Sequence, residues 1–188
     1  MIPLTPVPEP ADFDEKARKP GQEWLLANPT AERPRDFWGP FREALAEGVK
    51  HLCSYAAMFD PNGTMDHFLP FKTHPEQAYE WSNYRYATGW VNSSKKIRVA
   101  LDPHEVKEGW FEIQIPSMHL VATDRIPPDI RARISAPNGL IDWLNGERFK
   151  RVRTTWYNQY LTKKMSLEAL REYAPLIAKA IEAQHHKK

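Results

Sequence analysis

The sequence of 188 residues contains one cysteine, Cys53, and no long apolar run. A single thiol cannot form a disulfide within the chain or a zinc site of four thiolates. No segment is apolar for long enough to cross a membrane, and the first residues, MIPLTPVPEP, lack the basic and then apolar pattern of a secretion signal. We therefore expect a soluble, cytoplasmic protein with no membrane partner.

Net charge is also small, because 26 Lys and Arg residues oppose 24 Asp and Glu residues. A net charge of +2 does not by itself mark a nucleic-acid-binding protein. Basic residues are nevertheless concentrated between Arg131 and Lys164. Their side chains could contact the phosphate backbone of a nucleic acid. A solvated helix face explains the same pattern equally well. The candidate phosphate contacts in this segment are Arg148, Lys150, Arg151 and Arg153.

Aromatic residues and prolines are abundant. Seven Trp, seven Tyr and eight Phe predict a folded chain, because so much aromatic surface needs burial or a ligand. Many of the 17 prolines lie near the N-terminus, which predicts an extended arm over residues 1–35 that lies across the body of the protein. Residues 36–188 are then predicted to form a single domain.

Hydrophobic periodicity predicts an α+β fold. Between Cys53 and Asn92 the sequence is typical of two short strands joined through a turn. Helices and further strands are expected on either side of this segment. The expected elements are a helix over 37–52 capped by Asp36, strands over 97–101 and 110–115, a short helix that Pro127-Pro128 opens and that runs through Ile134, a longer helix capped by Asn138, and a helix from Ser166 that Pro175 kinks or splits.

An acidic residue and a histidine stand side by side at Asp66 and His67. A carboxylate is a hard oxygen ligand suited to Mg²⁺, while an imidazole with a pKa near neutrality can remove a proton from water. Successive side chains of a strand point to opposite faces, so the pair requires either a local distortion or two different tasks. A surface turn after Asn62 and Gly63 is the simpler explanation of the dipeptide taken alone.

The surrounding motifs resemble those of the HNH nucleases, in particular a bacterial subgroup that includes nucleases of Septu-type anti-phage defence. The resemblance covers residues 52–115 and includes the nine-residue step from Asn83 to Asn92. It implies a ββα-metal core over 52–115, embedded in a mostly helical domain with a helical C-terminal part over 127–188. The matching motifs are Asp66-His67-Phe68-Leu69-Pro70, His74-Pro75-Glu76 and Trp81-Ser82-Asn83.

By this resemblance, the protein is a metal-dependent endonuclease. His67 would be the general base, Asn83 would orient it, and Asp66 and Asn92 would hold one divalent cation, Mg²⁺ or Mn²⁺. Asn83 alone is also a common turn residue, and Asn92 a common helix cap. The implied partners are DNA and a partner ATPase or another protein subunit, and the further implied DNA contacts are Lys72, Lys95 and Lys96.

Two departures from the family pattern favour a second hypothesis. Many relatives carry two cysteine pairs that bind structural zinc, but here three of the four positions are Ala56, Thr88 and Val91, so we expect no structural zinc. The lysine expected after Pro70 is Phe71. The alternative is therefore a catalytically inactive module of HNH type that binds nucleic acid or assembles with a partner.

Overall fold

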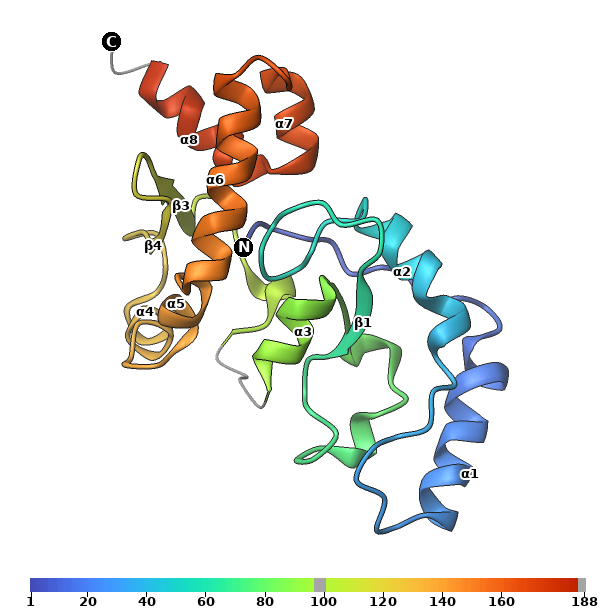
Figure 1. Cartoon of the computed structure of the whole chain (residues 1–188). Helices are drawn as coiled ribbons and strands as arrows, with labels where there is room; N and C mark the ends of the chain where they lie inside the picture. The colour runs from blue at the N-terminus through green and yellow to red at the C-terminus, as the bar shows by residue number, and fades with distance from the viewer. Residues whose placement is uncertain (97–100, 186–188) are drawn as a thin grey trace. The chain divides into compact units, whose positions relative to one another are not determined.

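A computed structural model of the protein describes residues 1–96 and 101–185 (Figure 1). The described residues form helices and two small antiparallel sheets, so the predicted α+β class is confirmed. The chain divides into two compact units, which differs from the predicted arm and single domain. The β1–β2 unit comprises Thr5–Cys53 and Asp60–Val99, and the β3–β4 unit comprises Met1–Leu4, Ser54–Phe59 and Ala100–Lys188.

The first sheet pairs strands β1 (Thr64–His67) and β2 (Tyr84–Ala87). Helix α3 (Gly89–Lys95) follows β2 almost directly and lies beside β1 (Figure 1). The chain order is therefore strand, strand, helix, within the segment where the sequence predicted two short strands. All four side chains of β2 are buried, because the unit packs around this strand.

Helix α2 (Arg42–Gly48) also packs against this sheet. It is shorter than the predicted helix over 37–52, and a 3₁₀ turn over Gly39–Phe41 precedes it. The carboxylate of Asp36 accepts a hydrogen bond from the backbone N–H of Gly39 at 2.7 Å. Asp36 therefore caps the start of this helical segment, as the sequence predicted.

The N-terminal segment is helical where an extended arm was predicted. A π-helical turn over Asp14–Arg18 leads into α1 (Lys19–Ala27). Pro20 follows the π-helical turn directly, and the chain is helical on both sides of it. The proline count therefore overestimated the extended structure of this segment, because the helical stretch runs through Pro20.

Aromatic side chains join this N-terminal segment to the sheet. The fully buried ring of Phe13 makes edge contacts with Phe41 at 5.0 Å, Trp81 at 5.1 Å and Tyr84 at 6.0 Å between ring centroids. The indole N–H of Trp81 donates to the backbone oxygen of Val7 at 2.8 Å. The supposed arm is therefore part of the core of the β1–β2 unit.

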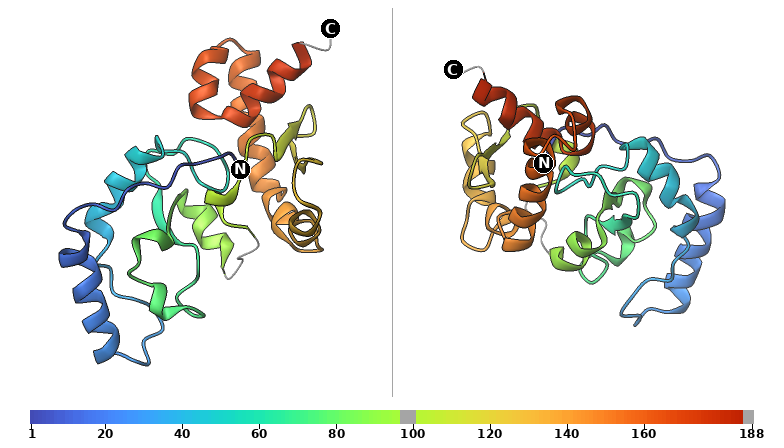
Figure 2. Two further views of the ribbon diagram at one scale, coloured as in Figure 1. Left: turned by 180° about the vertical axis from the view of Figure 1, so that it is seen from behind. Right: turned by 45° about the horizontal axis from the view of Figure 1, so that its top comes forward.

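The second sheet pairs β3 (Phe111–Gln114) with β4 (His119–Ala122), so the strand predicted over 110–115 is confirmed. The other predicted strand, over 97–101, lies outside the described residues except for Leu101. The helices of this unit are α4 (Pro128–Ile134), α5 (Leu140–Leu144), α6 (Glu147–Leu161), α7 (Leu167–Tyr173) and α8 (Pro175–His185). Helices α6, α7 and α8 contact one another, α8 packs against β3, and α5 contacts β4 (Figure 2).

Local signals determined where the C-terminal helices begin. Ser166 accepts a hydrogen bond from the N–H of Ala169 and so caps α7. The predicted split at Pro175 is confirmed, because α7 ends at Tyr173 and α8 starts at the proline. None of the described helices is long and apolar enough to cross a membrane.

Gly21 gives a test of the packing between α1 and the segment before β2. A methyl group on Gly21 would lie 2.3 Å from Cγ of the buried Tyr79 ring. Glycine to alanine in an open helix stabilises by about 0.5–1 kcal/mol. We predict that Gly21→Ala instead lowers the free energy of unfolding by about 1–3 kcal/mol, because the ring must move. Urea denaturation measures the change.

Gly89→Ala is the matched control, because nothing lies within 4 Å of its added methyl group. It is expected to leave stability unchanged or slightly raised. A stabilising Gly21→Ala would contradict the packing of α1 on Tyr79.

Candidate active site

The four residues implied by the resemblance all lie in the β1–β2 unit. Asp66 and His67 end β1, Asn83 ends a 3₁₀ turn that leads into β2, and Asn92 lies on α3. The ladder is regular, with Asp66 opposite Arg85, so no bulge turns the two β1 side chains to one face. The side chains of Asp66 and His67 accordingly have separate partners.

Asp66 is bound by a buried ammonium group. The Nζ atom of Lys95 lies 2.9 Å from Oδ2 and 3.2 Å from Oδ1 of Asp66, and it donates to the backbone oxygen of His67 at 2.6 Å. The side chains of Lys95 and Asp66 are only 2% and 5% exposed. Lys95 follows Asn92 by three residues, so both lie on the same face of α3. The ion pair therefore joins α3 to β1.

Asn92 lies next to this ion pair. Its Nδ2 donates to the backbone oxygen of Met65 at 3.3 Å, one residue before Asp66. A carboxylate and an amide oxygen are the hard ligands that Mg²⁺ and Mn²⁺ accept together with water. The described residues contain no cluster of three or more His, Cys, Asp or Glu side chains that could hold a metal ion. The donor types at Asp66 and Asn92 fit a divalent cation, but Lys95 engages the carboxylate.

The imidazole of His67 is held in one orientation. Its Nε2 lies 2.9 Å from the backbone oxygen of Ala78, and the hydroxyl of Tyr84 donates to the same oxygen at 2.7 Å. The ring stands perpendicular to the indole ring of Trp38, with 4.7 Å between centroids. A carbonyl oxygen only accepts, so Nε2 carries the proton and Nδ1 keeps its lone pair. Nδ1 has no hydrogen-bonding partner within the part of the chain that the structure describes.

The surroundings of His67 favour the neutral imidazole. Burial lowers the pKa of His67 from its ordinary value of 6.5, because the charged form loses solvation. The hydrogen bond to Ala78 partly opposes this shift, and the positive charge of Lys95 adds to it. At neutral pH the ring can therefore accept a proton at Nδ1.

Asn83 acts on the loop between the two strands. Its Oδ1 accepts from the backbone N–H of Leu69 at 2.8 Å, and its Nδ2 donates to the backbone oxygens of Leu69 and Gln77 at 3.1 and 3.0 Å. The amide does not contact the imidazole of His67, which the resemblance implied it would orient. Asn83 instead fixes Gln77, the neighbour of Ala78, and so holds the carbonyl group that binds His67.

The lysines expected to contact DNA in this unit have different environments. Lys72 and Lys96 are exposed, whereas Lys95 is buried against Asp66. Charge alone could not predict this difference. The three-residue step from Asn92 to Lys95 was the available signal, because it places both on one face of the helix. No local signal pointed to Trp38, which meets His67 through tertiary packing.

The basic residues of α6 also differ in exposure. Arg148 and Arg151 are exposed, and Lys150 forms an ion pair with Glu147. Arg153 is 2% exposed, and its guanidinium donates to the backbone oxygens of Met118 and Leu144 at 3.0 and 2.7 Å. Arg153 therefore holds the β3–β4 unit together and is not accessible to a nucleic acid, contrary to its assignment from sequence.

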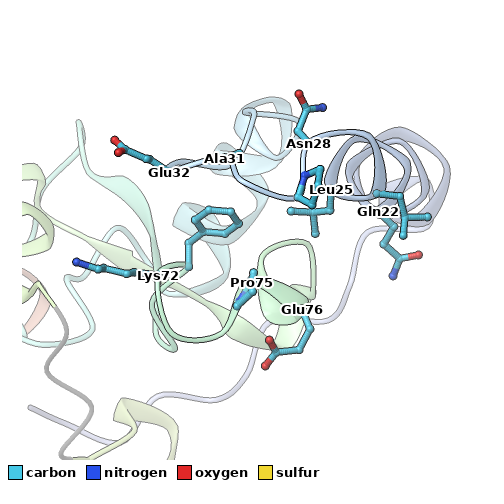
Figure 3. Close-up of a pocket in the computed structure, with 11 residues that line it drawn as sticks. Gln22, Leu25, Asn28, Ala31, Glu32, Lys72, Pro75 and Glu76 are labelled. Carbon is cyan, nitrogen blue, oxygen red and sulfur yellow. The ribbon is translucent and has the colours of Figure 1, made fainter.

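A cavity of about 870 Å³ lies beside the loop that follows His67 (Figure 3). Leu25 and Asn28, from the end of α1 and the turn after it, line one side, and Pro75 and Glu76 line the other. Lys72 also lines the cavity, and the amine end of its side chain points away from the other lining residues (Figure 3). Leu26, 85% exposed, also borders this cavity, so apolar surface is open to solvent here.

Comparison with known proteins gives no family for this chain. It matches no protein-family model, no curated protein and no solved structure. A function therefore has to be argued from the geometry of the site.

The role of Asn83 can be tested by stability. We predict that Asn83→Ala lowers the free energy of unfolding by about 2–4 kcal/mol, because it removes three hydrogen bonds to part-buried backbone groups of Leu69 and Gln77. Asn28→Ala removes an exposed amide with one hydrogen bond, to Trp24, and is expected to cost less than about 1 kcal/mol. Equal losses in urea denaturation of the two variants would show that Asn83 does not fasten the loop.

Proposed function

We propose that the protein is a metal-dependent endonuclease that hydrolyses phosphodiester bonds of DNA, with β1, β2 and α3 as a ββα-metal core of HNH type. The observation that supports this most is the state of His67. Its Nε2 proton is engaged by Ala78, while Nδ1 keeps a lone pair for a proton. A histidine with a packing role alone would not require a fixed tautomer with a lone pair on Nδ1.

In this proposal His67 removes a proton from the attacking water. The water oxygen then attacks phosphorus as the bond to the leaving oxygen breaks, and the proton stays on Nδ1. Ala78 holds Nε2–H throughout, so the new imidazolium keeps its orientation. Asn83 supports the reaction indirectly, by fixing the loop that carries Ala78.

Asp66 and Asn92 would hold one Mg²⁺ or Mn²⁺ ion. Such an ion, when bound, polarises the scissile phosphate and stabilises charge on the leaving oxygen. Exposed cations in each unit would contact the DNA backbone and position it without reading its sequence. These residues are Lys72, Lys96, Arg148 and Arg151.

The biological setting in this proposal is anti-phage defence or another conflict with mobile elements. It follows only from the resemblance of Asp66-His67 and Trp81-Ser82-Asn83 to nucleases of that kind. The same resemblance supplies the partner ATPase or other protein subunit.

A second function is favoured by one specific observation. Asp66 is already neutralised by the buried ammonium of Lys95. A descendant that had lost catalysis could keep this internal ion pair in place of a metal. Such a module would bind nucleic acid or a partner protein without a divalent cation, and binding would survive Asp66→Ala.

Cleavage of plasmid DNA in Mg²⁺ or Mn²⁺ tests the proposed function. We predict that His67→Ala lowers the cleavage rate at least about 100-fold, because the proposal assigns removal of the proton to this imidazole. His74→Ala is the matched control and keeps the wild-type rate. His74 belongs to the same loop and pairs with the exposed Glu76.

Equal cleavage by the wild-type protein and His67→Ala would refute the assignment. DNA binding that needs no metal and persists in Asp66→Ala, with no cleavage by any variant, would identify the inactive module instead.

The depressed pKa of His67 predicts the pH dependence of cleavage. Only the deprotonated ring acts as a base, so kcat/KM should rise with pH and level off above the pKa of His67. Because burial lowers that pKa, the midpoint of the rise should lie below the ordinary 6.5. Initial rates measured between about pH 5 and 8 at saturating metal give the profile. A midpoint above 6.5 would contradict the environment described for His67.

A further inference from the structure

Three oxygen atoms surround the buried ammonium of Lys95. Two belong to the carboxylate of Asp66 and one to the backbone of His67, at 2.6 to 3.2 Å. Carboxylate and carbonyl oxygens are also the ligands of hard divalent cations. Lys95 therefore occupies an environment with the chemistry of a cation site.

Asp66 cannot serve two cations at this position without a large electrostatic cost. An ammonium beside a divalent ion in a poorly solvated site repels it, whereas either one alone satisfies the carboxylate. The bonds of Lys95 to Asp66 and of a metal ion to Asp66 are thus alternatives. Loading of the site requires the ammonium to leave.

The position of Lys95 allows such a movement. It is the last residue of α3, and the following residue, Lys96, is exposed. The side chain has four rotatable bonds, so its ammonium can move without displacement of the helix. The centroid of the neighbouring Phe68 ring lies 6.0 Å from Nζ. The ring can make a cation–π contact with the ammonium as it moves away from Asp66.

We propose that Lys95 is a resident cation of the metal site, which a divalent ion must displace from Asp66. The inference rests on the proposed function for its metal ligands, Asp66 and Asn92. The ammonium keeps the buried carboxylate paired when no metal is bound, and it weakens metal binding by competing for the same oxygens. Lys95 thereby sets the metal concentration that the protein requires.

Titration with Mn²⁺ alone, followed by electron paramagnetic resonance of the free ion, tests the competition. We predict that Lys95→Met, which keeps the length of the side chain and removes its charge, binds one Mn²⁺ at least about tenfold more tightly than the wild type. Lys96→Met removes a neighbouring exposed charge and should change the affinity less than about threefold. Adding Asp66→Asn to Lys95→Met should abolish the tight site.

Unchanged or weaker Mn²⁺ binding by Lys95→Met would overturn the proposal, as would an equal gain in Lys96→Met. Circular dichroism of each variant establishes that it is folded before the titration.

Chemical labelling tests the same displacement in the wild-type protein. Acetic anhydride modifies accessible amines, and mass spectrometry of peptides reports the extent at each lysine. Lys95 should be protected in metal-free protein and several-fold more reactive in saturating Mn²⁺, while Lys72 reacts equally in both. Protection of Lys95 that does not change with Mn²⁺ would overturn the proposal.

The two proposals fail in different ways. Tight Mn²⁺ binding by Lys95→Met together with no DNA cleavage by the wild type would sustain the role of Lys95 and remove the nuclease assignment. Metal-dependent cleavage lost in His67→Ala, with no gain in Mn²⁺ affinity in Lys95→Met, would do the reverse.

Discussion

The ion pair between Asp66 and Lys95 is the interaction on which the candidate site depends. It joins the end of β1 to the end of α3, both otherwise short elements, across a nearly solvent-free contact. A buried ammonium is costly unless it is fully paired, and here three oxygen contacts pair it. Asn92, one turn earlier on α3, is thereby placed beside β1. In our proposal, the ammonium of Lys95 also competes with a metal ion for Asp66.

The other half of the site is ordered by a loop. His67 is held by the carbonyl group of Ala78, and that carbonyl group is held by Tyr84 and, through Gln77, by Asn83. Aromatic packing closes the arrangement from the N-terminal segment, through Trp38. His67, the proposed general base, is thus oriented by tertiary contacts, while Asp66, the proposed metal ligand, is held by its ion pair with Lys95. Substitutions in the two halves should therefore act on different steps, proton transfer and cation binding.

The fold could be predicted from sequence where local signals determine it. The alternation of residues 110–115, the cap at Ser166 and the break at Pro175 each concern a few neighbouring residues. The helix α1 and the core position of Phe13 were missed, because they depend on partners far along the chain, such as Tyr79 for Gly21 and Trp81 for Phe13. The division into two units was missed too, since each unit is assembled from separate stretches of chain. The residues proposed for the site were chosen from their motif. The burial of Lys95 and Arg153 could not be predicted in this way, because the sequence does not distinguish a buried cation from an exposed one.

A crystal structure of the wild-type protein grown in Mn²⁺ tests the central claim most directly, because anomalous scattering locates the ion without reference to activity. The account predicts one Mn²⁺ between the side-chain oxygens of Asp66 and Asn92, with the ammonium of Lys95 moved away from Asp66 and His67 still bound to Ala78 through Nε2. Lys95 remaining on Asp66, with no ion beside it at saturating Mn²⁺, would contradict both the metal site and the role given to Lys95.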